Sequence, residues 1–357
     1  MYLSRVRIHG LRGAADGGLE LDLPGRFTVL TGANGAGKTT ITDAIYLGHN
    51  KRFPQLPRHP AAALGPGDRD IEVQYRFESD VADEGPLGQQ LQAQSGRSAP
   101  GTEASLWAKT LHRSLGTIST KPLGDSSEVE PQTLLVHLPA WRNPVDELAR
   151  RETRILVELL RAQQQNQGRG RDLTRLRGRA SGLLEALASD PLLQGLENRV
   201  GDQLRALSAG VARNWPYIRG QVVDDRYLAR VLELMLATIE GRSGALPLEV
   251  VGLGYVNLLH IAVTLAAIPD SRQTAVAALA EPTDDADGDS RADELEDSER
   301  ILRQARAESE SAEDSFFPDG PFHVTLVIEE PEAHLHPQLQ HTLVRYLRRQ
   351  VQLRPEL

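Results

Sequence analysis

Two motifs far apart in the chain carry residues suited to nucleotide chemistry. The first matches G-x-x-x-x-G-K-[ST] in full and is followed by one more threonine: Gly32, Ala33, Asn34, Gly35, Ala36, Gly37, Lys38, Thr39 and Thr40. The glycines let backbone N–H groups curl around phosphate oxygens, and a helix that begins at Lys38 adds the partial positive charge of its N-terminus. In such a loop Lys38 reaches the β- and γ-phosphates, and Thr39 ligates magnesium. This run therefore predicts a site for ATP and Mg²⁺.

The second motif is a pair of adjacent carboxylates at the end of an apolar run. Glu329 and Glu330 follow residues 322–328, and Pro331 ends the predicted strand. Glu329 stands where a magnesium-coordinating carboxylate belongs, and Glu330 stands where a general base would align the attacking water. With Lys38 as the second catalytic residue, the pair predicts an ATPase. The alternative is a strand that simply ends in solvated acids.

Histidines directly after this motif leave a second alternative open. His334 and His336 lie beside the glutamates, and a His-x-His pair near carboxylates can bind a transition metal. No further set of ligands is visible in the sequence. A metal site therefore remains the less favoured interpretation of these residues.

Two further glycines precede an apolar helix late in the chain. Gly252 and Gly254 come directly before the predicted helix 255–268. A helix N-terminus attracts anions, so this position suits a γ-phosphate. A lone G-x-G is more often an ordinary turn or helix start, and only its place between the helical region and the second motif favours phosphate contact.

Periodicity in the sequence predicts the elements that position these motifs. Strict alternation over 71–78 is typical of a half-exposed strand, and the apolar runs 134–138 and 322–328 are typical of buried parallel strands. Further strands are expected at 2–9, 17–23, 26–30 and 104–111. Helices are expected at 38–47, over much of 145–210, and at 226–240, 255–268 and 337–352.

Charge along the chain is uneven. The net charge of the 357 residues is −9, but residues 281–319 alone carry −11, which predicts a loosely structured insertion. Asp287 and Asp289 in this insertion match the D-x-D pattern of a metal-binding pair, but we interpret them as part of a solvated linker. Residues 142–179 carry ten arginines and a net charge of +5. They would either contact a DNA backbone, with Arg169, Arg171, Arg175 and Arg177 as the residues to test, or form a solvated helix face with internal Glu–Arg pairs.

Composition excludes several classes of protein. The chain has no cysteine, so disulfides and thiolate metal sites are excluded, which fits a cytoplasmic protein. No run of about 18 apolar residues is present, so no membrane-spanning segment is expected. The N-terminal residues show no apolar signal-peptide core.

Taken together, the motifs resemble those of the ATPase heads of the ABC class. Within that class they are most similar to OLD-family ATP-dependent endonucleases, which are relatives of the SMC ATPases. The resemblance implies an α/β ABC-type P-loop head with a mixed sheet and an inserted helical lobe. It also implies that Gly252 and Gly254 contact a γ-phosphate held by a second subunit. His336 then stands at the D-loop position, and Arg142 at the Q-loop position beside Trp141.

The resemblance further implies an organisation and partners. We expect an ATPase lobe at 1–141, a helical lobe at 142–250, and residues 251–357 completing the ATPase around an acidic insertion at about 271–320. The expected partners are a second copy, paired through the heads, and double-stranded DNA, with no membrane. Three features depart from the family: Glu329 replaces an aspartate, the Q-loop position at Arg142 has no glutamine, and no switch histidine or Toprim nuclease domain is recognisable. We therefore expect the chain to be the ATPase part of a longer protein, hydrolysing ATP poorly and cleaving no DNA by itself.

Three functions remain to be compared. The leading hypothesis is the ATPase regulator of a DNA endonuclease, acting in defence against foreign DNA. The second is an SMC-like DNA-repair ATPase without a nuclease. The third, a transporter's nucleotide-binding subunit, is disfavoured because the motif at Gly252 is not of the Ser-Gly-Gly-Gln type.

Overall fold

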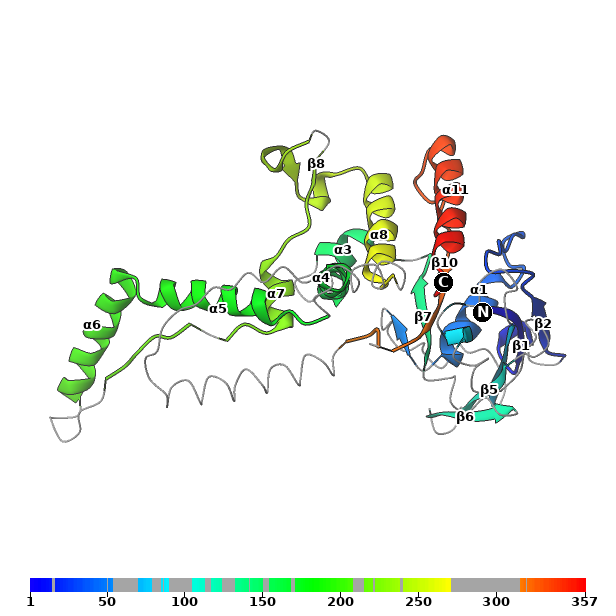
Figure 1. Cartoon of the computed structure of the whole chain (residues 1–357), viewed down its shortest axis with the longest axis horizontal. Helices are drawn as coiled ribbons and strands as arrows, with labels where there is room; N and C mark the ends of the chain where they lie inside the picture. The colour runs from blue at the N-terminus through cyan, green and yellow to red at the C-terminus, as the bar shows by residue number, and fades with distance from the viewer. Residues whose placement is uncertain are drawn as a thin grey trace.

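The computed structural model contains a larger antiparallel sheet, a smaller parallel sheet and a helical region (Figure 1). It describes residues 1–14, 17–49, 51–53, 70–78, 85, 87–89, 105–112, 117–123, 132–140, 142–149, 154–167, 171–207, 215–220, 222–237, 240–270, 315–318 and 320–357. Trp141 and nearly all of the acidic insertion, including Asp287 and Asp289, lie outside these residues.

The antiparallel sheet has the strand order β2-β1-β4-β5-β6. Its strands are β1 (Tyr2–His9), β2 (Leu19–Asp22), β4 (Ile71–Glu78), β5 (Ser105–His112) and β6 (Thr117–Leu123). The strands predicted at 2–9 and 71–78 are confirmed. Along β4 the side chains alternate between buried and half-buried, as the alternating sequence requires.

The parallel sheet brings the second motif beside a strand from the middle of the chain. Its order is β10 (His323–Ile328), β7 (Thr133–Leu138) and β3 (Arg52–Phe53). Every residue of β7 is buried, as expected for a continuous apolar run between layers. Ile328 pairs with Leu138, so β10 and β7 end together at one edge of the sheet.

Helix α1 (Lys38–Gly48) lies between the two sheets. Its buried Ala44 and Ile45 share a core with β1 and β4, and its Tyr46 ring lies 5.5 Å from the ring of His137 on β7. A side chain on Gly48 would collide with the Tyr75 hydroxyl, which donates to the Ile45 carbonyl. The α/β fold class is therefore confirmed, but the sheet that was expected to be single and mixed is divided into two sheets with α1 between them.

Two predicted elements are wrong. Residues 26–30 pair with no strand, and Arg26 instead donates to backbone oxygens of Arg354 and Leu357 at the far end of the chain. The helix predicted at 226–240 is much shorter than expected. It stops because Leu232 turns to an extended conformation.

The chain after this shortened helix forms a small hairpin. Helix α7 (Asp225–Val231) is followed by β8 (Leu236–Ala237), which pairs with β9 (Ala245–Leu246). Leu234 and Leu236 pack against the core formed with α8. Burial of these two leucines replaces the continued helix.

The remaining helices form the inserted region and a pair beside the parallel sheet. The inserted helices are α3 (Pro144–Ala149), α4 (Arg154–Asn166), α5 (Thr174–Ala188), α6 (Pro191–Leu207) and α7. Figure 1 shows α5 and α6 extending away from both sheets. The pair is α8 (Leu253–Ala267) and α11 (Pro337–Leu353), which share one apolar core with β7 and β10.

Short 3-10 turns lie at Arg12–Ala14, Arg242–Gly244 and Leu248–Val250. Within the described residues, no helix has both the length and the apolar character needed to cross a membrane.

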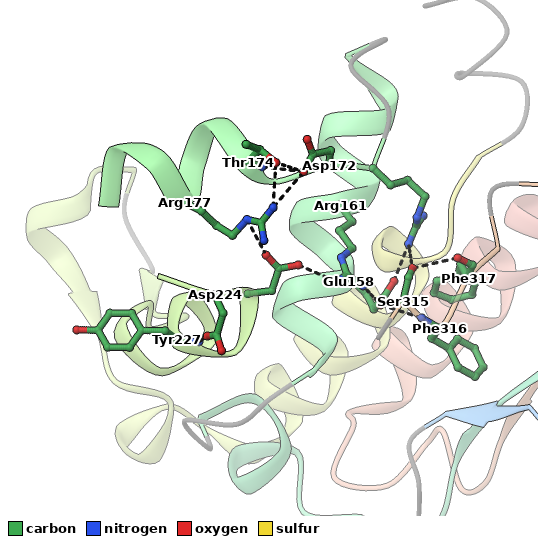
Figure 2. Close-up of polar contacts among 12 residues, drawn as sticks. Glu158, Arg161, Asp172, Thr174, Arg177, Asp224, Tyr227, Ser315, Phe316 and Phe317 are labelled. Atoms are coloured by element: carbon green, nitrogen blue, oxygen red, sulfur yellow. Dashed lines mark hydrogen bonds and ion pairs between the residues drawn. The ribbon is translucent and has the colours of Figure 1, made fainter. Parts of the chain in front are cut away.

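A buried network of charges holds the inserted helices together (Figure 2). The Glu158 carboxylate on α4 accepts from Arg161 at 3.0 Å, from Arg171 at 2.6 Å and from the Phe316 N–H at 3.0 Å. Asp225 on α7 accepts from Arg161 at 2.7 Å. The Nε of Arg177 on α5 lies 3.5 Å from the other Asp225 oxygen. The network therefore joins α4, α5, α7 and the segment that leads into β10.

This network corrects the interpretation of the arginine-rich stretch. The side chains of Arg161, Arg171 and Arg177 are at most 7 % exposed, so they cannot lie on a DNA backbone. Arg175 and Arg179 are exposed on α5, and Arg169 lies outside the described residues. The alternative interpretation, internal Glu–Arg pairing, is the one that the geometry supports, although the pairs are buried rather than solvated.

Replacing Glu158 with alanine should destabilise the fold strongly. The substitution leaves Arg161 and Arg171 buried with less compensating charge. Removing one partner of a buried ion pair costs about 3–5 kcal/mol of stability. Urea denaturation followed by circular dichroism measures this free energy of unfolding. The matched control is Asp202→Ala, whose pair with Arg205 is exposed and should contribute about 0–1 kcal/mol. Equal losses in the two variants would contradict the network's role.

Candidate nucleotide site

The glycine loop has the geometry of a phosphate cradle. Gly35 and Gly37 have φ angles of 81° and 93°, which side-chain-bearing residues rarely adopt. Helix α1 begins directly after Gly37, so its first N–H groups face the loop. The Lys38 ammonium donates to the carbonyls of Gly32 at 2.6 Å and Ala33 at 2.9 Å, which holds it over the loop. This set of exposed donors fits the phosphates of a nucleotide.

The Glu329 carboxylate reaches this loop's helix from the end of β10. One oxygen accepts from the Thr42 hydroxyl on α1 and lies 3.5 Å from His137 Nε2. The other oxygen accepts from the Ala140 N–H at 3.0 Å. Burial by itself would raise the pKa of Glu329, but the contacts from His137, Thr42 and Ala140 outweigh it and lower the pKa to about 2. The carboxylate is therefore ionised, as a ligand for magnesium must be.

Thr42 sets the distance between Glu329 and the predicted magnesium ligand Thr39. The Thr42 hydroxyl lies 3.2 Å from the Thr39 carbonyl, one helical turn earlier, and also contacts Glu329. Thr39 itself is exposed at the start of α1, and Thr40 beside it is half-buried. Glu329 thus contacts the helical turn that follows the one carrying Thr39, and the oxygen donors of both residues fit a hard cation. Sequence reasoning missed Thr42 and His137, because neither belongs to a motif.

Glu330 begins a tight turn outside the strand. Its φ is 44°, its side chain is exposed, and its carbonyl accepts from the Ala333 N–H at 3.0 Å. A left-handed backbone at a non-glycine residue costs of order 1–3 kcal/mol and persists only where surrounding contacts hold it. The turn therefore presents Glu330 at the edge where β7 and β10 both end.

Arg142 has a different place from the one predicted. Its side chain is buried and donates to Asn257 Oδ1 at 2.7 Å, to the Glu329 carbonyl at 2.7 Å and to the Pro139 carbonyl at 2.9 Å. Burial lowers its pKa, although nearby glutamates, including Glu329, oppose this. With its donors used in this way, Arg142 braces the ends of β7 and β10 against α8. Its predicted contact with a γ-phosphate gains no support from this geometry.

Helix α8 is fastened to the turn that carries Glu330. Asn257 donates to the Ala333 carbonyl at 3.1 Å while it accepts from Arg142. Gly254 lies in the first turn of α8, not before the helix as predicted, and a Cβ there would come within 2.5 Å of the His334 carbonyl oxygen. Close packing against the turn therefore explains Gly254 without a phosphate.

The remaining predicted residues lie at exposed positions near this turn. Gly252 is the N-cap of α8, and no atom lies within 4 Å of where its Cβ would stand. His336 is the N-cap of α11, where its ring nitrogen accepts from the Gln338 N–H. Among the described residues no group of three or more side chains is arranged to hold a metal, so His334 and His336 gain no support as a metal site.

One family of known proteins matches most of the chain. The family described as "AAA domain, putative AbiEii toxin, Type IV TA system" matches residues 27–353. No curated protein matches the sequence. Two solved structures are similar at low levels. One concerns "ATP-driven dimerization and DNA stimulated activation of SMC ATPases", with 17 % identity over 34 % of this chain and 69 % of that one, at a TM-score of 0.24. The other is the recombination mediator protein RecF-ATPrS, with 13 % identity over 94 % of both chains, at a TM-score of 0.34.

The two glycines of α8 should respond differently to alanine. Gly254→Ala pushes a Cβ against the His334 carbonyl, and such overpacking costs about 1–3 kcal/mol of stability. Gly252→Ala meets open space at a φ of −60° and should change stability by less than about 1 kcal/mol. Thermal and urea unfolding of both variants measure this. A Gly252→Ala variant as unstable as Gly254→Ala would show that the packing has been misassigned.

Ionisation of Glu329 should make stability depend on pH in acid. Its pKa is about 2 when folded and 4.5 as an ordinary glutamate, so its contribution is complete above pH 4.5 and is lost as the pH falls toward 2. Between about pH 5.5 and pH 3.5, the wild type should lose about 1 kcal/mol more than Glu329→Gln. Urea denaturation in metal-free buffer at several pH values tests this. Parallel pH profiles for the two proteins would contradict it.

Proposed function

Since the chain belongs to the AAA-domain family that it matches over most of its length, we propose that it binds and hydrolyses ATP with Mg²⁺. One observation carries this proposal: the Glu329 carboxylate of the second motif contacts Thr42, on the helix that begins at the glycine loop. Two motifs almost 300 residues apart in sequence therefore form one site. Its donors suit phosphates on one side, and its carboxylates suit a cation and a water on the other.

In this proposal the loop residues bind and orient the nucleotide. Backbone N–H groups of the loop and of the first turn of α1 surround the phosphates. Lys38 exchanges its contacts with the Gly32 and Ala33 carbonyls for phosphate oxygens and neutralises charge on the transferred group. Thr39 and Glu329 are the residues that would hold Mg²⁺. When bound, the ion neutralises developing charge on the phosphates.

Glu330 aligns the attacking water in this mechanism. It is the exposed carboxylate at the strand end, next to the buried Glu329, so it can accept a proton while Glu329 remains a ligand. The turn that holds its backbone is fixed by Asn257 and Gly254 of α8. Positioning of the base thus depends on α8 as well as on β10.

A second copy of the chain is proposed to complete the site. Gly252 stands exposed at the N-terminus of α8, where helix N–H groups can donate hydrogen bonds to the γ-phosphate held by another subunit. Exposed apolar side chains surround it: Val250, Leu253 and Tyr255. Such a patch supports a surface that pairs in the presence of ATP. His336 at the start of α11 would belong to the same surface, while Gly254 would act through packing.

At the finer level we propose an ATPase that acts with double-stranded DNA, as the regulator of an OLD-type endonuclease in defence against foreign DNA. The support is the resemblance of the Glu329–Pro337 run to that family. This resemblance covers far fewer residues than the AAA-domain match does. An SMC-like repair ATPase is compatible with the same site. The lobe boundaries at 142 and 250 and the cytoplasmic location stay predictions.

Replacing Glu330 with glutamine should separate ATP binding from turnover. The amide cannot accept the proton, so kcat should fall by about 10²-fold or more while ATP still binds. Unreacted ATP should then hold the paired state, seen by light scattering as a dimer that depends on ATP and Mg²⁺. The matched control is Glu332→Gln, an exposed glutamate two residues away, which should keep turnover. Turnover that survives in Glu330→Gln would show that another residue is the base.

A further inference from the structure

Helix α11 has one face in the core and an opposite face in solvent. Leu339, Leu343, Leu347 and Val351 recur every four residues and pack into the core shared with α8 and the parallel sheet. The opposite side carries residues at spacings of four, seven and eight, which one helical face brings together. These residues are His341, Arg345, Arg348 and Arg349, and all four are exposed.

Every side chain along this opposite side can donate a hydrogen bond, and none is acidic. The four basic residues are flanked on the same side by Gln338, Thr342 and Gln352, and α11 contains no Asp or Glu at all. We call these seven residues the α11 basic face. Among the described residues, no carboxylate lies within ion-pair distance of Arg345, Arg348 or Arg349. The buried side chains of Arg161, Arg171 and Arg177, in contrast, are paired with acids.

We propose that the α11 basic face binds the sugar–phosphate backbone of double-stranded DNA. Phosphate oxygens only accept hydrogen bonds, so a surface of Arg, Gln, Thr and His matches them without a mismatched group. The step from Arg345 to Arg349 covers about 6 Å along the helix axis, close to two phosphate steps of one strand. The proposal rests on the DNA partner of the proposed function and assigns that partner a surface, in place of the arginine-rich stretch, where Arg161, Arg171 and Arg177 are buried.

Two other partners fit the face less well. A membrane-surface helix must insert its apolar side among lipids, but Leu343 on that side is only 5 % exposed within the core. A protein interface needs an apolar anchor near its centre, but the exposed apolar side chains of α11, which are Val344, Tyr346 and Leu353, lie at the edges of the α11 basic face and not among its arginines. DNA requires neither feature, because contacts to its backbone need only positively charged side chains within reach of the phosphates.

The test compares two triple variants with equal changes in charge. One is Arg345→Gln, Arg348→Gln and Arg349→Gln on the α11 basic face. The control is Arg175→Gln, Arg179→Gln and Arg199→Gln, which are exposed on α5 and α6. Binding to a fluorescein-labelled duplex of about 30 base pairs, longer than the roughly 25 Å of α11, is followed by anisotropy over a range of salt concentrations.

The α11 variant should lose about tenfold or more in affinity at low salt, and its slope of log K against log salt should fall by about 2 to 3. The control should stay within about twofold of the wild type, and both variants should keep wild-type ATP turnover without DNA, which shows that the site is folded. An α11 variant that binds DNA like the wild type would overturn the assigned surface but leave the DNA partner. A wild type that binds no duplex would overturn both. Binding of polyglutamate in place of DNA, with the same arginine dependence, would assign the face to an acidic protein and overturn the proposal.

Discussion

The structure depends on one carboxylate that joins three elements. Glu329 comes from the end of β10, and its two oxygens are used by Thr42 of α1 and by the Ala140 N–H after β7. Its side chain is only 12 % exposed, so these bonds are made largely away from water, where an ionised acid must be well compensated. The glycine loop is therefore held at a set distance from the strand end. Without this contact, α1 would pack on the antiparallel sheet with no polar link to the site.

From Glu329 a chain of contacts runs to the surface where a second copy is proposed to bind. Arg142 donates to the Glu329 carbonyl and to Asn257 of α8, and Asn257 donates to the Ala333 carbonyl in the turn after Glu330. Gly254 closes the same turn by packing against His334. These contacts connect the N-terminus of α8, the turn at Glu330 and the end of β7.

Much of this arrangement could be predicted from local patterns, because the motifs and the periodicity of β4, β7 and β10 are visible over a few residues. The roles of Thr42 and His137 could not be, because they depend on which residues far apart in sequence meet across α1 and the parallel sheet. The choice between the two interpretations of the arginine-rich stretch could not be made from the sequence for a related reason: net charge does not reveal burial, and Arg161 pairs with Asp225 on another helix. The helix predicted at 226–240 failed because burial of Leu234 and Leu236 outweighed helix propensity.

The central claim is that the two motifs form one site for ATP and a divalent cation. A crystal structure with a non-hydrolysable ATP analogue and Mn²⁺, located by its anomalous scattering, tests this most directly. We predict one Mn²⁺ beside the phosphates, bound through Thr39 and Glu329, with Lys38 released from the Gly32 and Ala33 carbonyls. Mn²⁺ bound instead by His334 and His336, or a nucleotide bound away from the glycine loop, would contradict the claim.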